Sequence, residues 1–442
     1  MTTRRNFIKN TAAGSAGIAI GSLLMPSLSF GNILGANERL NVAIIGVRSR
    51  AKILTMGIHK YKDAKIIYTC DVDEDIIAKN NIFLQKNIGY VPNVVKDFRR
   101  ILDDKDVDVV FIATPEHWHA IMAILALKAG KHVYVEKPCS HNPFENELLV
   151  AAQKKYNKVV QMGNQQRSAA TSQLAVKEIK EGIIGEVYKG EAYYSNNRGS
   201  IGKGNKIAIP STLDWDLWQG PAPREDFRDN IHPYNWHWFK TWGTGEIHNN
   251  GTHEIDICRW AMGLDFPNKV TSFGGKFTFK DDWEFPDNQQ VTYQYDNYKT
   301  ISWTGHSRGV IIPSQPGRGA TIYGSEGTIT LSRNAYQLYS LDGELLKQED
   351  EKETNATLNT AGEGVLNISH IANFFDAIRI ESKQNSPISD ASKSTLICHL
   401  GNIAQEVGNT IQIDPKTGRI ENNKQAMKLW KRDYEKGWEP TL

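Results

Sequence analysis

From Leu40 onward the chain alternates short, mostly apolar runs with segments of helical character. This alternation restricts the possible folds more than any other feature. The apolar runs are 40–45, 65–69, 107–113 and 132–135. Continuous apolar runs are typical of parallel strands that are covered on both faces. The helical segments between them supply the crossovers that parallel strands require. The pattern predicts an α/β fold whose first domain, residues 38–160, is a doubly wound parallel sheet.

The second half of the chain has a different pattern. Its strand-like segments are aromatic, alternate apolar with polar positions, and are separated by Gly, Pro and Asn. They are 187–194, 290–295 and 300–303. Alternation indicates strands with one covered face. Residues 161–442 are therefore expected to form an α+β domain with an open-faced, mostly antiparallel sheet. Helices near 370–380 and 392–407 are expected to pack back on the first domain.

The amino terminus has the character of an export signal. Arg4 and Arg5 precede Phe7-Ile8-Lys9, and a weakly apolar, Gly/Ala-rich stretch continues to about Phe30. This order predicts a twin-arginine signal and linker over residues 1–37, a periplasmic or otherwise exported protein, and the twin-arginine translocase as a transient partner. The stretch is too short and too rich in glycine for a stable membrane anchor.

Composition excludes some classes of partner and leaves others open. A net charge of +2 gives no strong field toward nucleic acid, so no nucleic-acid partner is expected. The 11 tryptophans fit either core positions or sugar-stacking platforms. The four cysteines are widely spaced without a CxxC pair, which favours buried free thiols over a disulfide framework.

The turn after the first apolar run partly matches a dinucleotide-binding fingerprint. In residues 46–51, Gly46 fits the tight turn and Ala51 fits the last position, but Arg48 replaces the second glycine. An ordinary strand-to-helix turn explains these matches equally well. Arg48 and Arg50 could contact phosphate oxygens directly, and Ser49 lies between them.

Asp71 strengthens the dinucleotide interpretation of this turn. It ends the second apolar run, about 25 residues after the turn, where an acid binds the ribose diol of NAD. A carboxylate at this place repels a 2′-phosphate, so the sequence favours NAD over NADP as the cofactor, although the two arginines make that preference modest.

Three further segments resemble one enzyme family. They are Thr114–His119, Glu136–Pro138 and Gly245–Asp256. Together they resemble the Gfo/Idh/MocA family, which includes glucose–fructose oxidoreductase, inositol dehydrogenase and NAD-dependent α-N-acetylgalactosaminidases. The resemblance extends from about Asn41 to Glu406.

The resemblance implies roles for individual residues. Lys137 would lie near nicotinamide and the substrate hydroxyl and assist proton movement, often beside a cis bond to Pro138. His253 would be the active-site histidine, with a near-neutral pKa suited to taking a proton. Relatives place an aspartate one turn before this histidine, but this chain has Asn249. Asp256, His248 or a tyrosine is then open as its partner.

The predicted site residues fall into three groups. The catalytic candidates are Lys137, His253, Asn249 and Asp256. The cofactor-binding candidates are Gly46, Arg48, Ser49, Arg50, Asp71, Thr114, Pro115, His119, Glu136, Lys137 and Gln165. The substrate-binding candidates are Arg167, Tyr194, Trp236, His237 and His248, of which Arg167 could instead tie the two domains together.

A metal site is the competing interpretation of the histidines. His237, His248, His253 and Asp256 are suitable ligand types for a divalent ion. The spacing from His248 to His253 is not a regular helical pair, and the resembled family usually needs no metal. No metal is therefore predicted.

The sequence supports one main function and two alternatives. The main prediction is an exported NAD(P)-dependent oxidoreductase that transfers hydride between a tightly held nicotinamide cofactor and a sugar or polyol hydroxyl. The first alternative is a glycosidase that uses NAD catalytically, and the second is a non-catalytic sugar or nucleotide sensor. The open second-domain sheet predicts a homodimer or homotetramer formed face to face.

Overall fold

The computed structural model describes residues 39–309, 317–333, 335–351 and 363–442. The predicted signal and linker, residues 1–37, lie outside these ranges. None of the described helices is both long enough and apolar enough to cross a membrane.

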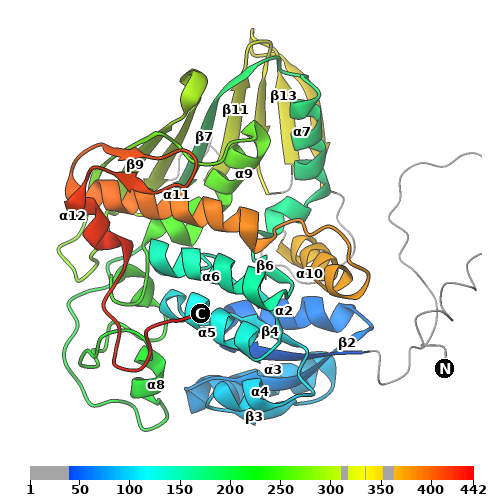
Figure 1. Cartoon of the computed structure of the whole chain (residues 1–442), viewed down its shortest axis with the longest axis vertical. Coiled ribbons are helices and arrows are strands. Elements are labelled where there is room, and N and C mark those ends of the chain that lie inside the picture. The colour runs from blue at the N-terminus through cyan, green and yellow to red at the C-terminus, as the bar shows by residue number, and fades with distance from the viewer. Residues whose placement is uncertain (1–38, 310–316, 334, 352–362) are drawn as a thin grey trace, which may run out of the picture. The chain divides into compact units, whose positions relative to one another are not determined.

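The first domain is a six-stranded sheet in which every neighbouring pair is parallel (Figure 1). Its strands, in spatial order, are β3 (Asn93–Val95), β2 (Ala64–Cys70), β1 (Leu40–Ile45), β4 (Val109–Ile112), β5 (His132–Val135) and β6 (Val160–Met162). The crossover helices are α2 (Ser49–Lys60), α3 (Glu74–Ile88), α4 (Arg99–Asp103), α5 (Glu116–Lys128) and α6 (Pro143–Tyr156). The strand order reverses between β1 and β4, so the carboxyl ends of these two strands flank a crevice where such sheets bind ligands. The predicted doubly wound sheet is confirmed.

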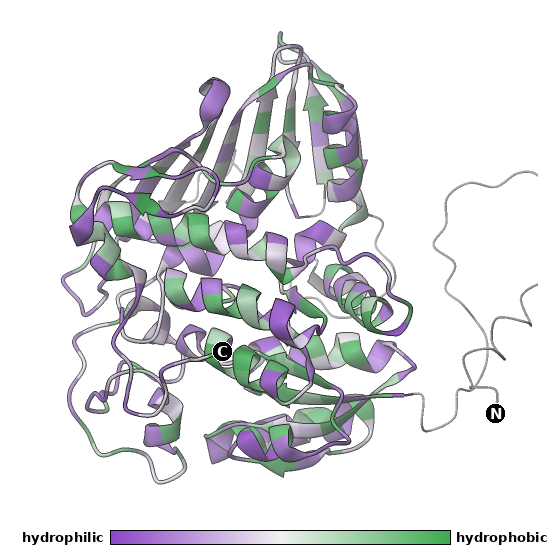
Figure 2. Ribbon diagram, viewed as in Figure 1, coloured by the Kyte–Doolittle hydropathy of each residue, from purple (hydrophilic) through white to green (hydrophobic). Residues whose placement is uncertain are grey.

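Burial explains why these runs became strands. All four residues of β4 are buried, and so are the last four residues of β1, since helices cover both faces of the sheet. Figure 2 shows this difference between the domains: strands of the first sheet are largely hydrophobic, whereas those of the second alternate.

The second domain is a mixed sheet of ten strands. In spatial order they are β14 (Leu345–Asp350), β13 (Ala335–Tyr339), β12 (Thr328–Leu331), β11 (Arg318–Gly324), β7 (Val187–Ser195), β10 (Thr300–His306), β9 (Asn288–Gln294), β8 (Lys269–Gly275), β15 (Ile411–Ile413) and β16 (Ile420–Glu421). The β10–β7 pair is parallel, and every other neighbouring pair of this sheet is antiparallel, which confirms the mostly antiparallel sheet.

Helices cover one face of this second sheet and join the domains. Helices α7 (Ala170–Lys180), α9 (Thr252–Met262) and α11 (Ile388–Val407) pack against its strands. Helix α10 (Glu363–Arg379) packs on α2, and its Phe374 and Phe375 enter the core of the first domain with Phe111. All four cysteines are buried free thiols, as expected.

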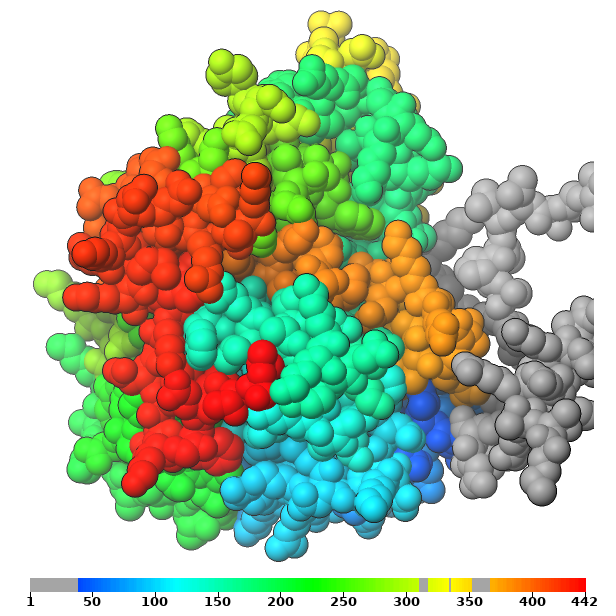
Figure 3. Space-filling view, in the orientation of Figure 1, coloured from blue at the N-terminus to red at the C-terminus, as the bar shows by residue number. Residues whose placement is uncertain are grey.

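A tryptophan-rich segment, residues 196–246, connects β7 to the helices that follow and has a small core of its own. It includes α8 (Trp215–Gln219) and a short 3-10 turn, η3 (Asn235–Trp238). The segment docks on the first domain through backbone bonds from Asp214 N to Val72 O (3.0 Å) and from Glu74 N to Thr212 O (2.9 Å). The carboxyl-terminal residues, red in Figure 3, lie across α5 and this segment, where Arg432 donates to the carbonyl of His117 (2.7 Å).

Candidate active site

A pocket of about 400 Å³ opens at the carboxyl ends of β1, β2, β4 and β5. Its walls come from the first domain, the tryptophan-rich segment, α9 and α10. The predicted residues that line it are Gly46, Arg48, Ser49, Arg50, Asp71, Thr114, Pro115, His119, Glu136, Lys137, Gln165, Trp236, His237, Asn249 and His253. Most of the site residues predicted from the sequence therefore line one pocket.

Gly46 makes the turn at the sheet's edge. Its φ of +82° lies in the left-handed region, and a Cβ on it would stand 2.6 Å from the carbonyl oxygen of Ala113. A side chain is excluded there for both reasons. The turn delivers the chain to Ser49, where α2 begins, so the first free N–H groups of that helix face the pocket.

Asp71 holds the same turn together from β2. Its carboxylate accepts bonds from the backbone N–H of Val47 (2.8 Å) and of Val72 (2.8 Å). Burial raises the pKa of Asp71 to about 6, against the lowering effect of those backbone bonds. The carboxyl thus lines the pocket at the place where a ribose diol would be bound.

The pocket fits a dinucleotide on three observations of this structure. The turn at Gly46 admits no side chain, a helix amino terminus faces the cavity, and Asp71 lies at the end of the next strand. In addition, the hydroxyl of Thr114 lines the pocket and is buried without a hydrogen-bond partner among the described residues. Such an orphaned donor at a cavity wall indicates a missing ligand.

Replacing Asp71 with Asn is expected to weaken NAD binding by about 10- to 100-fold, because a hydrogen bond to a charged group contributes about 1.5–3 kcal/mol. In the unaltered protein, NAD affinity should fall as pH drops through about 6, where Asp71 gains its proton. Calorimetric titration with NAD and NADP measures both effects. The prediction is contradicted if the variant binds NAD as tightly as the unaltered protein.

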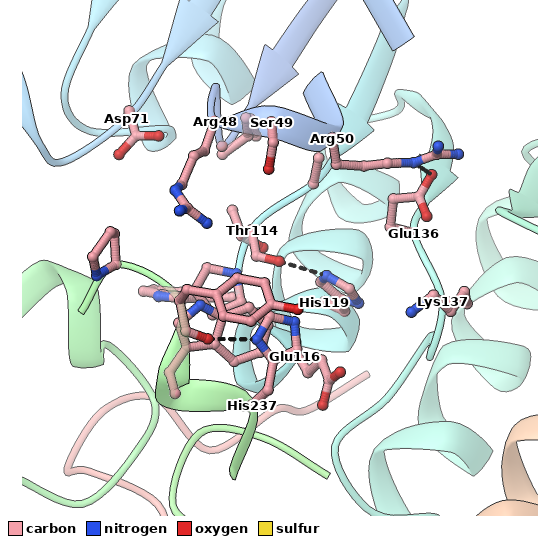
Figure 4. A pocket seen from close by; sticks show the side chains of 18 of the residues that line it. Arg48, Ser49, Arg50, Asp71, Thr114, Glu116, His119, Glu136, Lys137 and His237 are labelled. Atoms are coloured by element: carbon pink, nitrogen blue, oxygen red, sulfur yellow. Dashed lines mark hydrogen bonds and ion pairs between the residues drawn. The ribbon is translucent and has the colours of Figure 1, made fainter. Parts of the chain in front are cut away.

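The two arginines of the turn have different surroundings. Arg50 donates to Glu136 (2.8 Å) and to Asn367 of α10 (2.7 Å), so it ties the turn to the second domain. Arg50 lines the pocket as well, and its direct phosphate contact stays a prediction. Arg48 points into the pocket with its guanidinium 5.6 Å from the ring centroid of Tyr234 (Figure 4).

Glu136 and His119 organise the wall beside β5. Glu136 accepts from Arg50 and from the amide of Gln165 (3.2 Å). The two ring nitrogens of His119 face the carbonyl oxygens of Pro138 (2.6 Å) and Thr114 (2.8 Å). His119 therefore links the segment Thr114–His119 to Pro138. Both of its ring nitrogens are hydrogen-bonded to main-chain carbonyl oxygens.

Lys137 lies at the other end of the pocket from Asp71. Its ammonium donates to the backbone oxygen of Asn249 (2.5 Å) and lies 3.4 Å from the side-chain oxygen of that residue. Burial lowers the pKa of Lys137, which makes the neutral amine more accessible as a base. The bond between Lys137 and Pro138 is cis, as the resemblance implied.

A π-helical turn over Ile247–Gly251 sets the register of the active-site helix. Such turns insert an extra residue and recur at functional sites. Asn249 lies in this turn and His253 lies in α9, and both line the pocket. Burial places the pKa of His253 well below its ordinary value, so its imidazole is neutral at pH 7.

Asp256 does not line the pocket, which corrects its predicted catalytic role. Its carboxylate makes a two-point ion pair with Arg167, both distances 2.7 Å, and both side chains are almost fully buried. Arg167 also bonds Asp390 of α11 (2.5 Å). Arg167 does not line the pocket, and its ion pairs join the short turn after β6 to α9 and α11, all within residues 161–442.

Two predicted substrate contacts also lie outside the pocket. The hydroxyl of Tyr194 accepts from Asn196 (2.7 Å) and Arg198 (3.3 Å) on the sheet side. His248 is fully buried with its ring centroid 4.2 Å from that of His399. By contrast, Trp236 and His237 line the pocket as a stacked pair, with ring centroids 3.5 Å apart.

Four histidines, of which three are buried and His141 is partly buried, predict acid sensitivity. Burial lowers the pKa of His117 and His399 to about 3, and lowers those of His141 and His248 well below the ordinary value. The unfolded chain takes up protons near pH 6.5, while the folded protein does not. The free energy of unfolding should therefore fall below that pH, by about 1.4 kcal/mol per pH unit for each histidine.

Urea unfolding at several pH values measures this slope. His248→Leu should reduce the acid slope by one proton, because both ring nitrogens of His248 lack partners among the described residues. His59→Gln, a change at an exposed position, is the matched control. An unchanged slope in the His248 variant would mean that this histidine takes up its proton in the folded state.

Glu116 is a pocket residue that sequence reasoning missed. It is the first residue of α5, it is 2% exposed, and it accepts a hydrogen bond from the hydroxyl of Thr244. Burial raises its pKa to about 7, while Lys137 acts to lower it. Its position directly after Thr114-Pro115, at a helix start facing the sheet's edge, was the signal available in the sequence.

The metal interpretation does not match the geometry. The four residues considered as ligands are dispersed: His237 bonds the carbonyl of Tyr234, His248 packs on His399, and Asp256 pairs with Arg167. Within the part of the chain that the structure describes, no three His, Cys, Asp or Glu side chains converge as metal ligands would.

Comparison with known proteins agrees with this site. Residues 40–164 match the pattern of the "Oxidoreductase family, NAD-binding Rossmann fold", and residues 173–330 match that of the "GFO/IDH/MocA C-terminal domain". The chain belongs to the GFO/IDH/MocA oxidoreductase family. Between them the two patterns cover well over half of the sequence.

Two curated members of the GFO/IDH/MocA family illustrate its range. Levoglucosan dehydrogenase of Pseudarthrobacter phenanthrenivorans is 32% identical over 172 residues, 39% of this chain and 37% of that protein. A glycosyl hydrolase family 109 protein of Shewanella pealeana is 26% identical over 208 residues, 43% of this chain and 45% of that protein. The chain thus matches less than half the length of either relative.

Solved structures share the fold over most of the chain. A levoglucosan dehydrogenase in complex with NADH and levoglucosan has a TM-score of 0.67 at 21% identity, covering 85% of this chain and 99% of its own. An aldose–aldose oxidoreductase from Caulobacter crescentus, complexed with glycerol, has a TM-score of 0.64 at 17% identity, covering 85% and 100%. At these identities the likeness supports the two-domain architecture.

Proposed function

We propose that this chain is an exported oxidoreductase that moves hydride between a retained NAD and a sugar or polyol hydroxyl. The observation that carries the proposal is one pocket with two ends. Asp71 and the turn at Gly46 form the dinucleotide end, and Lys137, Asn249 and His253 form the catalytic end. Levoglucosan dehydrogenase among the relatives supports a sugar as the substrate class.

Several residues at the catalytic end contribute to removing the hydroxyl proton of the substrate. When bound, NAD would accept the hydride from the carbinol carbon. Lys137, with its pKa lowered by burial, takes the hydroxyl proton, and Asn249 fixes the position of the lysine through its backbone oxygen. Neutral His253 orients the hydroxyl by hydrogen bonding, and the stacked pair of Trp236 and His237 offers a platform for a sugar ring.

A twin-arginine route supports retention of the cofactor. This route carries folded proteins, so NAD bound in the cytoplasm would leave with its host. In the periplasm no free nicotinamide pool exchanges with the site, and each cycle must return the cofactor to its starting state. Recovery of the protein only from the cytoplasmic fraction would contradict the proposed export.

A homodimer or homotetramer is also part of the proposal. Helices α7, α9 and α11 cover one face of the second sheet, and the opposite face carries partly exposed Thr300, Ser302 and Thr304 of β10. This polar face would form a hydrogen-bonded interface rather than an apolar one. Light scattering that gives a monomer at working concentration would remove this part of the proposal.

The glycosidase alternative is favoured by one specific observation, the similarity to a glycosyl hydrolase family 109 protein. In that reaction a ring hydroxyl is oxidised, the adjacent C–H becomes acidic, the leaving group eliminates, water adds, and the ketone is reduced. No net change of the cofactor occurs.

A panel of sugars, polyols and chromogenic glycosides separates the two functions. If a free sugar reduces the bound NAD, as monitored by the fluorescence of NADH, the result supports the oxidoreductase. Glycoside cleavage without net NADH, with solvent deuterium at the carbon beside the transient ketone, supports the glycosidase. Binding without either turnover would favour a sensor and contradict the proposed function.

A further inference from the structure

The proposed reaction leaves one buried carboxyl of the catalytic end without a role. Glu116 reaches the pocket from the start of α5, while Lys137 reaches it from the end of β5 (Figure 4). Both side chains point toward the same end of the cavity. The inference below rests on the proposed function of that end.

A purely structural explanation accounts for part of this arrangement. A carboxylate at a helix amino terminus is stabilised by the helix dipole, and the hydroxyl of Thr244 satisfies one of its oxygens across the domain boundary. Neither fact requires the carboxyl to face a cavity. A carboxylate at a helix amino terminus is ordinarily exposed to solvent or fully hydrogen-bonded. Glu116, by contrast, is 2% exposed and lies on the pocket wall.

The electrostatic surroundings couple Glu116 to Lys137. On Glu116, burial raises the pKa, Lys137 lowers it and Glu246 raises it. On Lys137, burial lowers the pKa, Glu116 and Glu136 raise it, and the arginines Arg50 and Arg318 lower it. Each of the two groups thus makes the charged form of the other more stable, while burial opposes both charges.

Glu116 and Lys137 line the same cavity, and each forms its hydrogen bonds with a different residue. No ion pair within 4 Å joins Glu116 to Lys137 among the described residues, because the ammonium of Lys137 bonds Asn249 and the carboxyl of Glu116 bonds Thr244. The other titratable or charged groups that line the pocket around Lys137 include Arg50, His119, Glu136, His237, His253 and Arg333. Both groups therefore line a cavity in which a water or a substrate hydroxyl can be bound.

We propose that Glu116 is the proton-exchange partner of Lys137: the two groups share one proton through a water or substrate hydroxyl bound between them. With this resting proton on Glu116, the neutral amine of Lys137 accepts the substrate's hydroxyl proton, and the pair then holds two protons. The ammonium donates the second proton back to the oxygen as the ketone is reduced, which leaves the resting proton on Glu116. The O–H bond broken in one direction is the O–H bond formed in the other, and no other reagent is needed.

This exchange suits an enzyme that oxidises and then reduces at the same site. The oxidation step requires Lys137 to begin as a neutral amine, in a pocket that burial keeps away from bulk water. Glu116 meets this need because it is a second buried group that can hold the resting proton of the pair. Glu116 acts through Lys137, so its loss should change the pH dependence of turnover rather than the binding of NAD.

The first test needs no substrate. Infrared spectra of wild type minus Glu116→Gln should contain a protonated-carboxyl band at neutral pH that fades as pH rises through about 7. In Lys137→Gln the same band should persist to higher pH, because the ammonium no longer favours the carboxylate. Thr244→Val should also raise the midpoint, and it keeps Glu116 in place if the glutamine variant folds poorly.

Glu225→Gln is the matched control, because Glu225 also accepts a bond from a threonine hydroxyl, that of Thr241, outside the pocket. Its difference spectrum should not respond to Lys137→Gln. A Glu116 midpoint that is unchanged in Lys137→Gln would overturn the proposal, as would a carboxyl band that titrates in the ordinary range of exposed glutamates.

The second test uses the panel sugar with the highest turnover. Glu116→Gln should lower kcat by about tenfold or more, leave KM and NAD affinity unchanged, and abolish the limb of the pH profile near neutrality. A profile with its limb intact would mean that Glu116 is structural. If no sugar is turned over, the proposed function fails, while the infrared coupling still decides whether the two groups share a proton.

Discussion

Lys137→Met is expected to lower turnover of the substrate sugar by about 10²- to 10⁴-fold, the usual effect of removing a general acid–base group. The physical reason is that the variant keeps the apolar length of the side chain but cannot take the hydroxyl proton. NAD should stay bound, because the residues around Asp71 and Gly46 that form the dinucleotide end are untouched. Steady-state rates and the nucleotide content of the same preparation measure both effects.

Lys131→Met provides a matched control for that loss. Lys131 is also buried, and its ammonium donates to a backbone oxygen, that of Asp104 (2.5 Å), outside the pocket. Its replacement should affect stability but not the turnover of folded protein. If Lys137→Met retained more than a tenth of the wild-type rate, another group would have to be the base, and our assignment would be wrong.

Asp256→Ala is expected to cost about 3–5 kcal/mol of unfolding free energy, because it leaves the buried guanidinium of Arg167 without its main partner. The cost is large since the same network joins three elements. Arg167 precedes α7, Asp256 lies in α9, and α11 contributes Asp390 and Ser394, whose hydroxyl donates to Asp256 (2.6 Å). Urea unfolding of both proteins measures the difference in unfolding free energy, provided that the m-value is the same for both.

Arg419→Ala tests the contrast with a surface pair. Arg419 bonds Glu147 at 2.9 Å, but both groups are substantially exposed, so the expected cost is about 0–1 kcal/mol. The Asp256 variant should also keep its rate per folded molecule. Loss of turnover in a fully folded Asp256 variant would restore that residue to the catalytic set and contradict the purely structural role given to it here.

The parts of the fold that follow from local patterns were predictable. Strands such as β1 and β4 are covered on both faces, and their continuous apolar runs indicate this directly. Asp71 was identifiable because its distance from the turn at Gly46 is set by the length of one helix and one strand. The first sheet and the dinucleotide end of the pocket therefore follow from sequence.

The catalytic end was less predictable because it depends on packing between domains. Helical spacing alone places Asn249, His253 and Asp256 on one face, and the first two do line the pocket. Asp256 instead pairs with the buried Arg167, a contact that helical spacing cannot predict. His248 is the same kind of side chain as His253, and only its burial against His399 separates them.

The central claim is that this protein holds NAD in the pocket described here, and one measurement tests it most directly. The purified protein is denatured, and any released nucleotide is identified by chromatography and mass. Our account predicts stoichiometric NAD or NADH, and a strongly reduced amount from Asp71→Asn. Recovery of no nucleotide, together with no binding when NAD or NADP is added back, would contradict it.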